Sequence, residues 1–166
     1  MTTLRRQRRS LRAALLVLVL SLTPAVLLWQ PGHATTTEQI VVDRNSGLAI
    51  YGYDPVAYFT DSAAKVGRAN LELTYAGAAW RFGNEGNRAA FAKDPQVYMP
   101  QYGGHDPVAI ASNIARAGHP EVWAIHNGRL FLFYSDDARR QFDADPAQME
   151  QQADANWPQV RLTLAP

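Results

Sequence analysis

With 166 residues the chain is long enough for one compact domain, and its lack of cysteine excludes disulfides, thiolate metal sites and cysteine nucleophiles. The formal net charge is +1, but five of the 16 basic residues are arginines within the first 12 positions. Without that segment 11 basic residues face 15 acidic ones, a net charge of −4, and no basic run remains that would favour nucleic-acid binding.

The first 34 residues have the pattern of an export signal. The arginine-rich start precedes an apolar run, Ala13–Trp29, and small residues follow near Ala34. We predict a signal peptide over 1–34. The alternative is an uncleaved N-terminal anchor, because about 17 apolar residues are the least that span a bilayer. The pair Arg8-Arg9 partly resembles a twin-arginine signal. The predicted location is therefore exported, periplasmic or extracellular, with membrane contact only through an uncleaved anchor.

A tetrapeptide, Asp-Pro-Val-Ala, occurs at Asp54–Ala57 and again at Asp106–Ala109, 52 residues later. Other residues recur at an offset of 51, namely Gly67 and Gly118, Gly77 and Gly128, Phe82 and Phe133, Phe91 and Phe142, and Asp94 and Asp145. A shared pattern of this length predicts an internal duplication. We expect a linker over 35–47 and a domain over 48–160, made of repeats 48–101 and 102–158.

The first repeat predicts a short helix, a hairpin and two further short helices, over Asp54–Phe59, Leu71–Phe82, Asn84–Ala92 and Asp94–Tyr98. Asp54-Pro55 starts the first helix, because Asp caps free N–H groups and Pro fits the first turn. Alternating apolar residues on both sides of Ala76-Gly77 predict the hairpin. Before the repeat, Ile40–Val42 is a candidate edge strand.

The second repeat predicts the same order, with a hairpin over Glu121–Phe133, a helix over Ser135–Phe142, and a last helix from Asp145 that carries Met149, Ala153 and Trp157. The hairpin turn is Asn127-Gly128, a pair favoured where both central residues need positive φ. A unit of about 50 residues buries too little surface alone, so we expect the copies to pack with pseudo-two-fold symmetry into one α+β domain. The expected shared core consists of Trp80, Phe82, Phe91, Trp123, Phe131, Phe133 and Phe142.

Four ordered motifs carry a family resemblance, at Gly52–Phe59, Gly77–Phe91, Tyr98–Gly104 and Ala153–Pro158. Together they resemble exported bacterial proteins of the YHS-domain family, over roughly 48–160. In metal-binding relatives, including TRASH domains, such a module resembles a small treble-clef unit that holds a metal ion with cysteines. The resemblance therefore implies two tandem YHS-like modules.

The cysteine positions of those relatives are all occupied by other residues in this chain. They correspond to Ala57 and Ala109 after Asp-Pro-Val, Gly83 and Tyr134 at the hairpin ends, and Asn87 and Ala138 in the helices. Alanine and glycine offer no ligand atom, and Asn and Tyr replace a thiolate poorly. A subset of exported relatives has Tyr-Cys-Ala after Gly-Gly, where this chain has His105-Asp106-Pro107. The resemblance thus implies a scaffold without its thiolate metal site.

The histidines beyond residue 34 all lie in the second repeat, as His105, His119 and His126, opposite Tyr53, Arg68 and Tyr75 of the first. One hypothesis is that His105, Asp106 and His119 converge on zinc, copper or iron. The other is that they are ordinary residues, since their spacing matches no ligand motif. Asp106, like Asp54, is also explained as a helix cap.

Our leading prediction is a non-enzymatic binding or accessory protein that needs no cofactor and recognises a small ligand or a periplasmic protein. The candidate ligand-binding residues are Tyr53, Tyr102, His105 and Asp106, where the two copies differ or meet. Two alternatives stay open. One is the metal-binding protein that uses His and Asp ligands, and the other is a hydrolase-like enzyme at the groove between the repeats.

Overall fold

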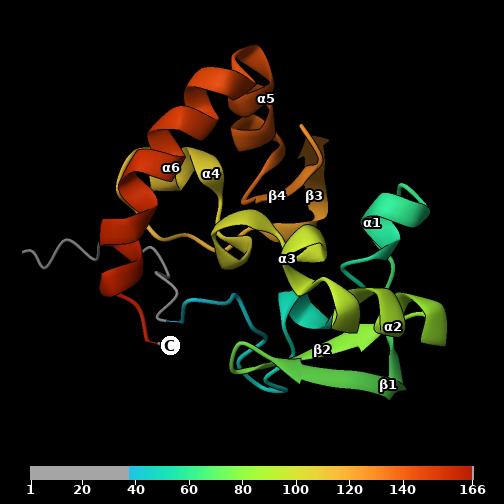
Figure 1. The fold of residues 1–166 in the computed structure, drawn as a ribbon. Coiled ribbons are helices and arrows are strands. Elements are labelled where there is room, and N and C mark those ends of the chain that lie inside the picture. Colours follow the sequence, from blue (N-terminus) through green and yellow to red (C-terminus); the bar gives the residue numbers. More distant parts are fainter. Residues whose placement is uncertain (1–37, 166) are drawn as a thin grey trace, which may run out of the picture. The chain divides into compact units, whose positions relative to one another are not determined.

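The computed structural model describes residues 38–165, so the predicted signal segment 1–34 lies outside the described part. Over 38–165 the fold is mixed, with six α-helices, two 3-10 helices and two antiparallel sheets of two strands each (Figure 1). Within these residues no helix is both long enough and apolar enough to cross a membrane.

The elements of the first half are η1 (Ile50–Gly52), α1 (Ala57–Thr60), β1 (Arg68–Tyr75), β2 (Ala78–Phe82), α2 (Glu85–Lys93) and α3 (Pro95–Tyr98). Those of the second half are η2 (Gln101–Gly104), α4 (Pro107–Ala111), β3 (His119–His126), β4 (Arg129–Phe133), α5 (Asp136–Ala144) and α6 (Pro146–Leu162). Both predicted hairpins and the helices that follow them are present. The predicted edge strand at Ile40–Val42 is wrong, because Val42 forms only an isolated bridge, to Ala49.

Side-chain caps explain where the main helices begin. The side chains of Asn84, Ser135 and Asp145 each accept a hydrogen bond from the backbone N–H three residues later, at 2.8, 3.2 and 3.0 Å. At the other end, α6 continues through Pro158 to Leu162. A proline inside a helix removes a hydrogen bond, and in the turn after it Val160 is buried in the core.

The two hairpins share a geometry. In each, the two turn residues have positive φ, at 49° and 80° for Ala76-Gly77 and at 50° and 73° for Asn127-Gly128. Each sheet also has an irregular register near the start of its first strand, before Glu72 in β1 and before Trp123 in β3. The hairpins lie apart, with α5 and α6 beside β3–β4 and α2 beside β1–β2 (Figure 1).

The expected single aromatic core is divided into two clusters. Phe91 packs with Trp80 and Phe82 in one cluster, and Phe142 packs with Phe131 and Phe133 in the other. Strand β4 lies between them, because Leu130 and Leu132 belong to the first cluster while Phe131 and Phe133 belong to the second. The shared part of the core is therefore one strand that is buried on both faces.

Two further contacts hold the described residues together. Tyr58 donates a hydrogen bond to the carbonyl of Pro120 at 2.9 Å, and its ring meets Trp123 edge-on at 5.2 Å. At the N-terminal side the backbone N–H of Val41, a fully buried residue, donates to the carbonyl of Gly103 at 2.8 Å. Residues 38–43, part of the expected linker, are thus packed on the domain, while 44–47 are exposed.

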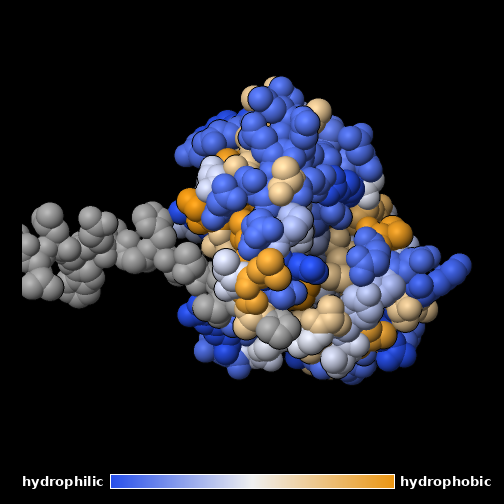
Figure 2. Space-filling model, turned by 60° about the vertical axis from the view of Figure 1, so that its left-hand side comes forward, coloured by the Kyte–Doolittle hydropathy of each residue, from blue (hydrophilic) through white to orange (hydrophobic). Residues whose placement is uncertain are grey.

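Hydrophilic side chains cover most of the surface around α5 and α6, at the top of the view, and hydrophobic ones gather in smaller groups lower on that face (Figure 2). The sequence of α5 explains this, since only Ala138 and Phe142 of its nine residues are buried. The outer side of this helix faces solvent.

Candidate functional site

Asp106 is a predicted ligand-binding and metal residue. It is buried, and both of its carboxylate oxygens accept hydrogen bonds from the backbone. One carboxylate oxygen accepts from the N–H of Val108 at 2.9 Å, and the other from the N–H of Tyr134 at 3.2 Å. Burial raises the pKa of Asp106, and these hydrogen bonds oppose the rise. The carboxylate caps α4 and holds the end of the second hairpin against it.

Asp54 has the equivalent place in the first half. It accepts from the N–H groups of Val56 and Gly83 at 2.9 and 2.7 Å, and from the side-chain amide of Asn87 at 2.6 Å. Ala57, Gly83 and Asn87 line one cavity beside this carboxylate. The three cysteine positions implied by the family resemblance therefore do lie together in space.

The residues at these positions do not fit a metal ion. Ala57 and Gly83 have no side-chain donor atom, and Asn87, whose amide nitrogen donates to Asp54, offers one neutral oxygen in place of three thiolates. The second half places Ala109, Tyr134 and Ala138 at one cavity in the same way.

His105 lies in the interior. Its side chain is fully buried, and Nδ1 lies 2.7 Å from the carbonyl oxygen of Tyr102. A carbonyl can only accept, so Nδ1 carries the proton and donates. Burial lowers the pKa of His105, which favours the neutral imidazole inside the protein. The ring packs against Trp157, at 5.7 Å between centroids.

The predicted metal set is not assembled as a ligand cluster. His119 is exposed on β3, where its Nδ1 accepts from the N–H of Glu121 at 3.3 Å, while His105 and Asp106 are buried with the partners given above. Among residues 38–165 no three His, Asp or Glu side chains are placed so that they could hold a metal ion. Metal binding by these residues stays a prediction.

The two predicted tyrosines have different surroundings. Tyr53 donates to Glu121 at 3.0 Å and so joins the two halves at the surface. Tyr102 is buried and donates to Asp154 at 2.9 Å. Burial and this carboxylate raise the pKa of Tyr102 well above its ordinary value. Of the four predicted ligand-binding residues, Tyr102 lines the cavity described next.

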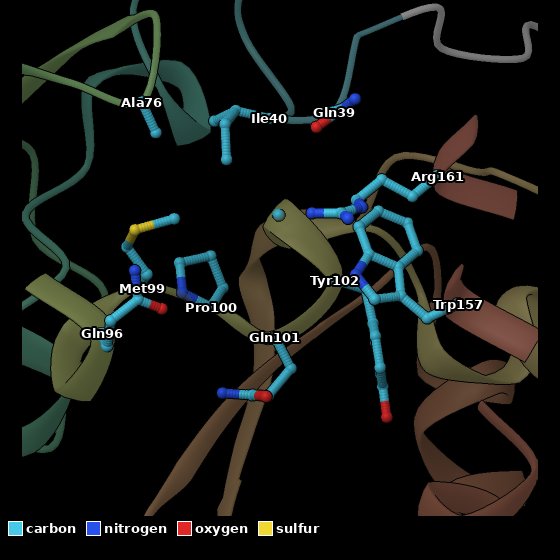
Figure 3. A pocket seen from close by; sticks show the side chains of 11 residues that line it. Gln39, Ile40, Ala76, Gln96, Met99, Pro100, Gln101, Tyr102, Trp157 and Arg161 are labelled. Atoms are coloured by element: carbon cyan, nitrogen blue, oxygen red, sulfur yellow. The ribbon is translucent and has the colours of Figure 1, made fainter. Parts of the chain in front are cut away.

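That cavity, which we call the junction cavity, has a volume of about 300 Å³ and is lined by both halves of the domain and by the N-terminal segment. Trp157 and Arg161, one turn apart on α6, enter it from one side. Met99 and Pro100 face them from the other (Figure 3). Its size is at the lower end of the range for small-molecule sites.

Amide side chains line the rest of the junction cavity. Gln39 comes from the N-terminal segment, Gln96 from α3 and Gln101 from η2. Gln96 donates to the Tyr75 hydroxyl at 3.0 Å, so its carbonyl oxygen can still accept; Gln101 accepts from Arg129 at 2.9 Å, so its amide nitrogen can still donate. The cavity thus offers both donors and acceptors.

Arg161 is the cation of this cavity. Its side chain is exposed, and within the described residues no hydrogen bond or ion pair engages it. Guanidinium keeps its charge at every physiological pH and matches the geometry of a carboxylate or phosphate. The lining therefore combines an available cation, three amides and two aromatic rings.

A charged network that the sequence did not predict supports the cavity from behind. Arg129 binds both Glu150 and Asp154, at 3.0 and 2.8 Å, and Glu150 also contacts His126. The hydrogen bond from Arg129 is the main cause that lowers the pKa of Asp154. Because Asp154 accepts from Tyr102 as well, the network connects β4 and α6 to the cavity wall. In the sequence, this network could have been recognised from the spacing of Glu150 and Asp154, which are four residues apart and therefore lie on the same side of a helix.

Family models, curated proteins and solved structures were compared with the chain, and none of them matches it.

Proposed function

We propose that the chain is an exported, non-enzymatic binding protein made of two YHS-like modules without their thiolate metal site. Its ligand is a small hydroxylated carboxylate, such as a sugar acid, bound in the junction cavity. The observation that carries this proposal is that Arg161 and Trp157 line the same cavity, together with three glutamines. Arginine binds a carboxylate through two parallel hydrogen bonds, amides bond hydroxyl groups, and indole packs on the apolar face of a sugar ring.

Matching contacts in the two halves support the duplication. Phe91 packs on two aromatic rings of β2 at centroid distances of 5.1 and 5.2 Å. Phe142, 51 residues later, packs on two rings of β4 at 5.0 and 5.2 Å. Asp54 and Asp106 likewise each cap a short helix region and accept from the residue after the hairpin. Two copies of one ancestral module account for these equivalences.

The chemistry of the lining supports binding over catalysis. Its polar side chains are amides, a guanidinium and a tyrosine, and Arg161 cannot act as a general base because it does not lose its proton. The Tyr102 hydroxyl donates to Asp154, and its pKa is raised. A hydrolase at this place would need a group that takes up a proton near neutral pH. The lining residues supply none.

Fluorescence titration of the purified full chain with glucuronate tests the proposal. The chain has four tryptophans, so Trp157→Phe identifies the part of the signal that comes from the cavity. We expect a saturable change in emission, and Arg161→Gln should raise Kd about tenfold or more, because a hydrogen-bonded charge pair is lost. Glucose, which lacks the carboxylate, should bind as weakly to the wild type as glucuronate does to the variant.

The matched control is Tyr102→Phe, which keeps the ring in the wall and removes a hydroxyl that is directed to Asp154. This variant should bind glucuronate like the wild type. The proposal is wrong if glucuronate, galacturonate and gluconate all fail to saturate the chain, or if Arg161→Gln binds them unchanged. Stoichiometric binding of zinc or copper that His105→Ala abolishes would favour the metal-binding alternative instead.

A further inference from the structure

A second cavity, the arginine groove, lies where the loop after Val42 meets the start of β3, and its volume is about 460 Å³. It is separate from the junction cavity and shares no lining residue with it. Its lining includes two arginines, two tyrosines and one carboxylate, namely Arg44, Arg116, Tyr51, Tyr134 and Asp43.

The groove presents two guanidinium groups that no carboxylate neutralises directly. Among the described residues, neither Arg44 nor Arg116 forms an ion pair. The guanidinium carbon of Arg116 lies 4.7 Å from the centroid of the Tyr134 ring, and this stacking orients the side chain. Arg116 also exerts a minor attraction on Asp106, which lies outside the groove lining.

Asp43 is the acidic residue of the groove, and its carboxylate accepts hydrogen bonds from its own loop. Its Oδ1 accepts from the N–H of Asn45 at 2.9 Å, and from the N–H and hydroxyl of Ser46 at 2.8 and 3.0 Å. These hydrogen bonds, chiefly those from Ser46, lower the pKa of Asp43. Two arginines therefore face one carboxylate that already shapes the loop, and the groove attracts anions within an otherwise acidic domain.

Two exposed tyrosines complete the groove. Tyr51 and Tyr134 keep 42% and 57% of their surface accessible, so both rings can contact a ligand. Tyr51 also has a left-handed backbone, with φ 58° and ψ 24°. Tyr102 of η2, 51 residues later, has the same conformation, with φ 54° and ψ 30°, so this backbone geometry occurs in both halves.

We propose that the arginine groove binds a small organic anion in which a planar ring carries a phosphate group. Arg44 and Arg116 bind the phosphate oxygens, and Tyr51 and Tyr134 pack on the ring. Arginine suits this task because its planar fork bonds two oxygens at once and also stacks on aromatic rings. The arginines thus account for the phosphate of the proposed ligand, and the exposed tyrosines account for its planar ring.

The test is calorimetric titration of the purified full chain with phenyl phosphate, compared with inorganic phosphate and benzyl alcohol. Phenyl phosphate should bind more tightly than either fragment. We expect Arg116→Gln to raise its Kd at least about tenfold, the usual effect of removing a charged hydrogen-bond donor. Arg44→Gln, at an exposed position where loss of folding is no concern, should raise Kd in the same direction. Tyr51→Ala should weaken phenyl phosphate but leave inorganic phosphate unchanged.

Two arginine variants serve as controls. Arg139→Gln removes an exposed arginine of α5 that pairs with Asp143, and it should leave phenyl phosphate binding unchanged. Arg161→Gln, in the junction cavity, should do the same. The proposal is overturned if phenyl phosphate does not bind, if either fragment binds as tightly, or if Arg116→Gln and Arg44→Gln bind like the wild type. Loss of phenyl phosphate binding in Arg161→Gln alone would move the site to the junction cavity and overturn it as well.

Discussion

At the scale of single residues, burial determines what the predicted polar residues can do. From the sequence, His105 is a candidate ligand because it stands opposite Tyr53 of the first half, and Asp106 is one because it is the neighbouring carboxylate. Both are instead in the interior, where the imidazole donates to a backbone carbonyl and the carboxylate accepts from two backbone N–H groups. Spacing along the chain cannot reveal this, because the partners of a buried polar group come from the surrounding fold.

The buried imidazole predicts a specific pH dependence of stability. Burial lowers the pKa of His105 below its unfolded value, and the hydrogen bond to Tyr102 and the attraction from Glu38 oppose this effect. The unfolded chain therefore takes up a proton first, so the stability present above about pH 6.5 is lost as the pH falls toward the folded-state pKa. His105→Asn, which keeps a donor for the Tyr102 carbonyl, should flatten this dependence by up to about 1.4 kcal/mol per pH unit.

Urea unfolding at a series of pH values between about 7 and 5 measures this effect. His119→Asn is the matched control, since His119 is exposed and its removal should leave the wild-type slope. Equal slopes for His105→Asn and the wild type would contradict the prediction.

At the scale of elements, the two hairpins look alike in sequence but have different roles. Strand β2 alternates buried and partly buried residues, whereas in β4 every residue after Arg129 is buried. The run Leu-Phe-Leu-Phe is typical of a strand covered on both sides, and the two core clusters are those two sides. Packing also outweighs local preference in helix α6. The helix continues through Pro158, although a proline in this position favours the end of a helix.

The different burial of equivalent strand positions gives an element-scale prediction. Leu132 of β4 corresponds to Arg81 of β2, 51 residues earlier, but Leu132 has no exposed surface while the Arg81 side chain keeps 28%. Leu132→Ala should lower the free energy of unfolding by about 2–5 kcal/mol, because it leaves a cavity between the clusters. Arg81→Ala should cost less than about 1 kcal/mol, since it removes a surface pair with Glu72.

Denaturant unfolding followed by circular dichroism compares these two variants. The reverse order of stability would show that β4 is not the central strand of the core. A similar small loss in both would mean that the structure relaxes around the cavity and that the clusters are less tightly packed than described.

At the scale of the whole molecule, a few polar contacts join the two halves, and they contribute unequally to the free energy of unfolding. The hydroxyl of Tyr58 is buried and donates to the Pro120 carbonyl, while the hydroxyl of Tyr53 meets Glu121 at the surface. Tyr58→Phe should therefore cost about 1–3 kcal/mol by leaving a buried carbonyl without its donor. Tyr53→Phe should change the free energy of unfolding by less than about 1 kcal/mol, because water replaces the partner.

The same pair tests whether the halves fold as one unit. Thermal unfolding of Tyr58→Phe should shift as a single transition to lower temperature, with near- and far-ultraviolet circular dichroism changing together. Two separate transitions would contradict the shared strand β4. A larger loss in Tyr53→Phe than in Tyr58→Phe would contradict the difference in burial.

Local chemistry was enough to predict most of the elements. Asn84 and Ser135 as caps, and Asn127-Gly128 as a hairpin turn, act through residues two or three positions away, so their effects can be read along the chain. Asp54 was predicted to start a helix because it precedes Pro55, and its carboxylate does accept from the backbone N–H of Val56. The junction cavity could not be predicted, because Arg161 meets Met99 and Gln39 through packing between segments far apart in sequence. Long-range contacts of this kind depend on how the core fills, which no spacing of residues encodes.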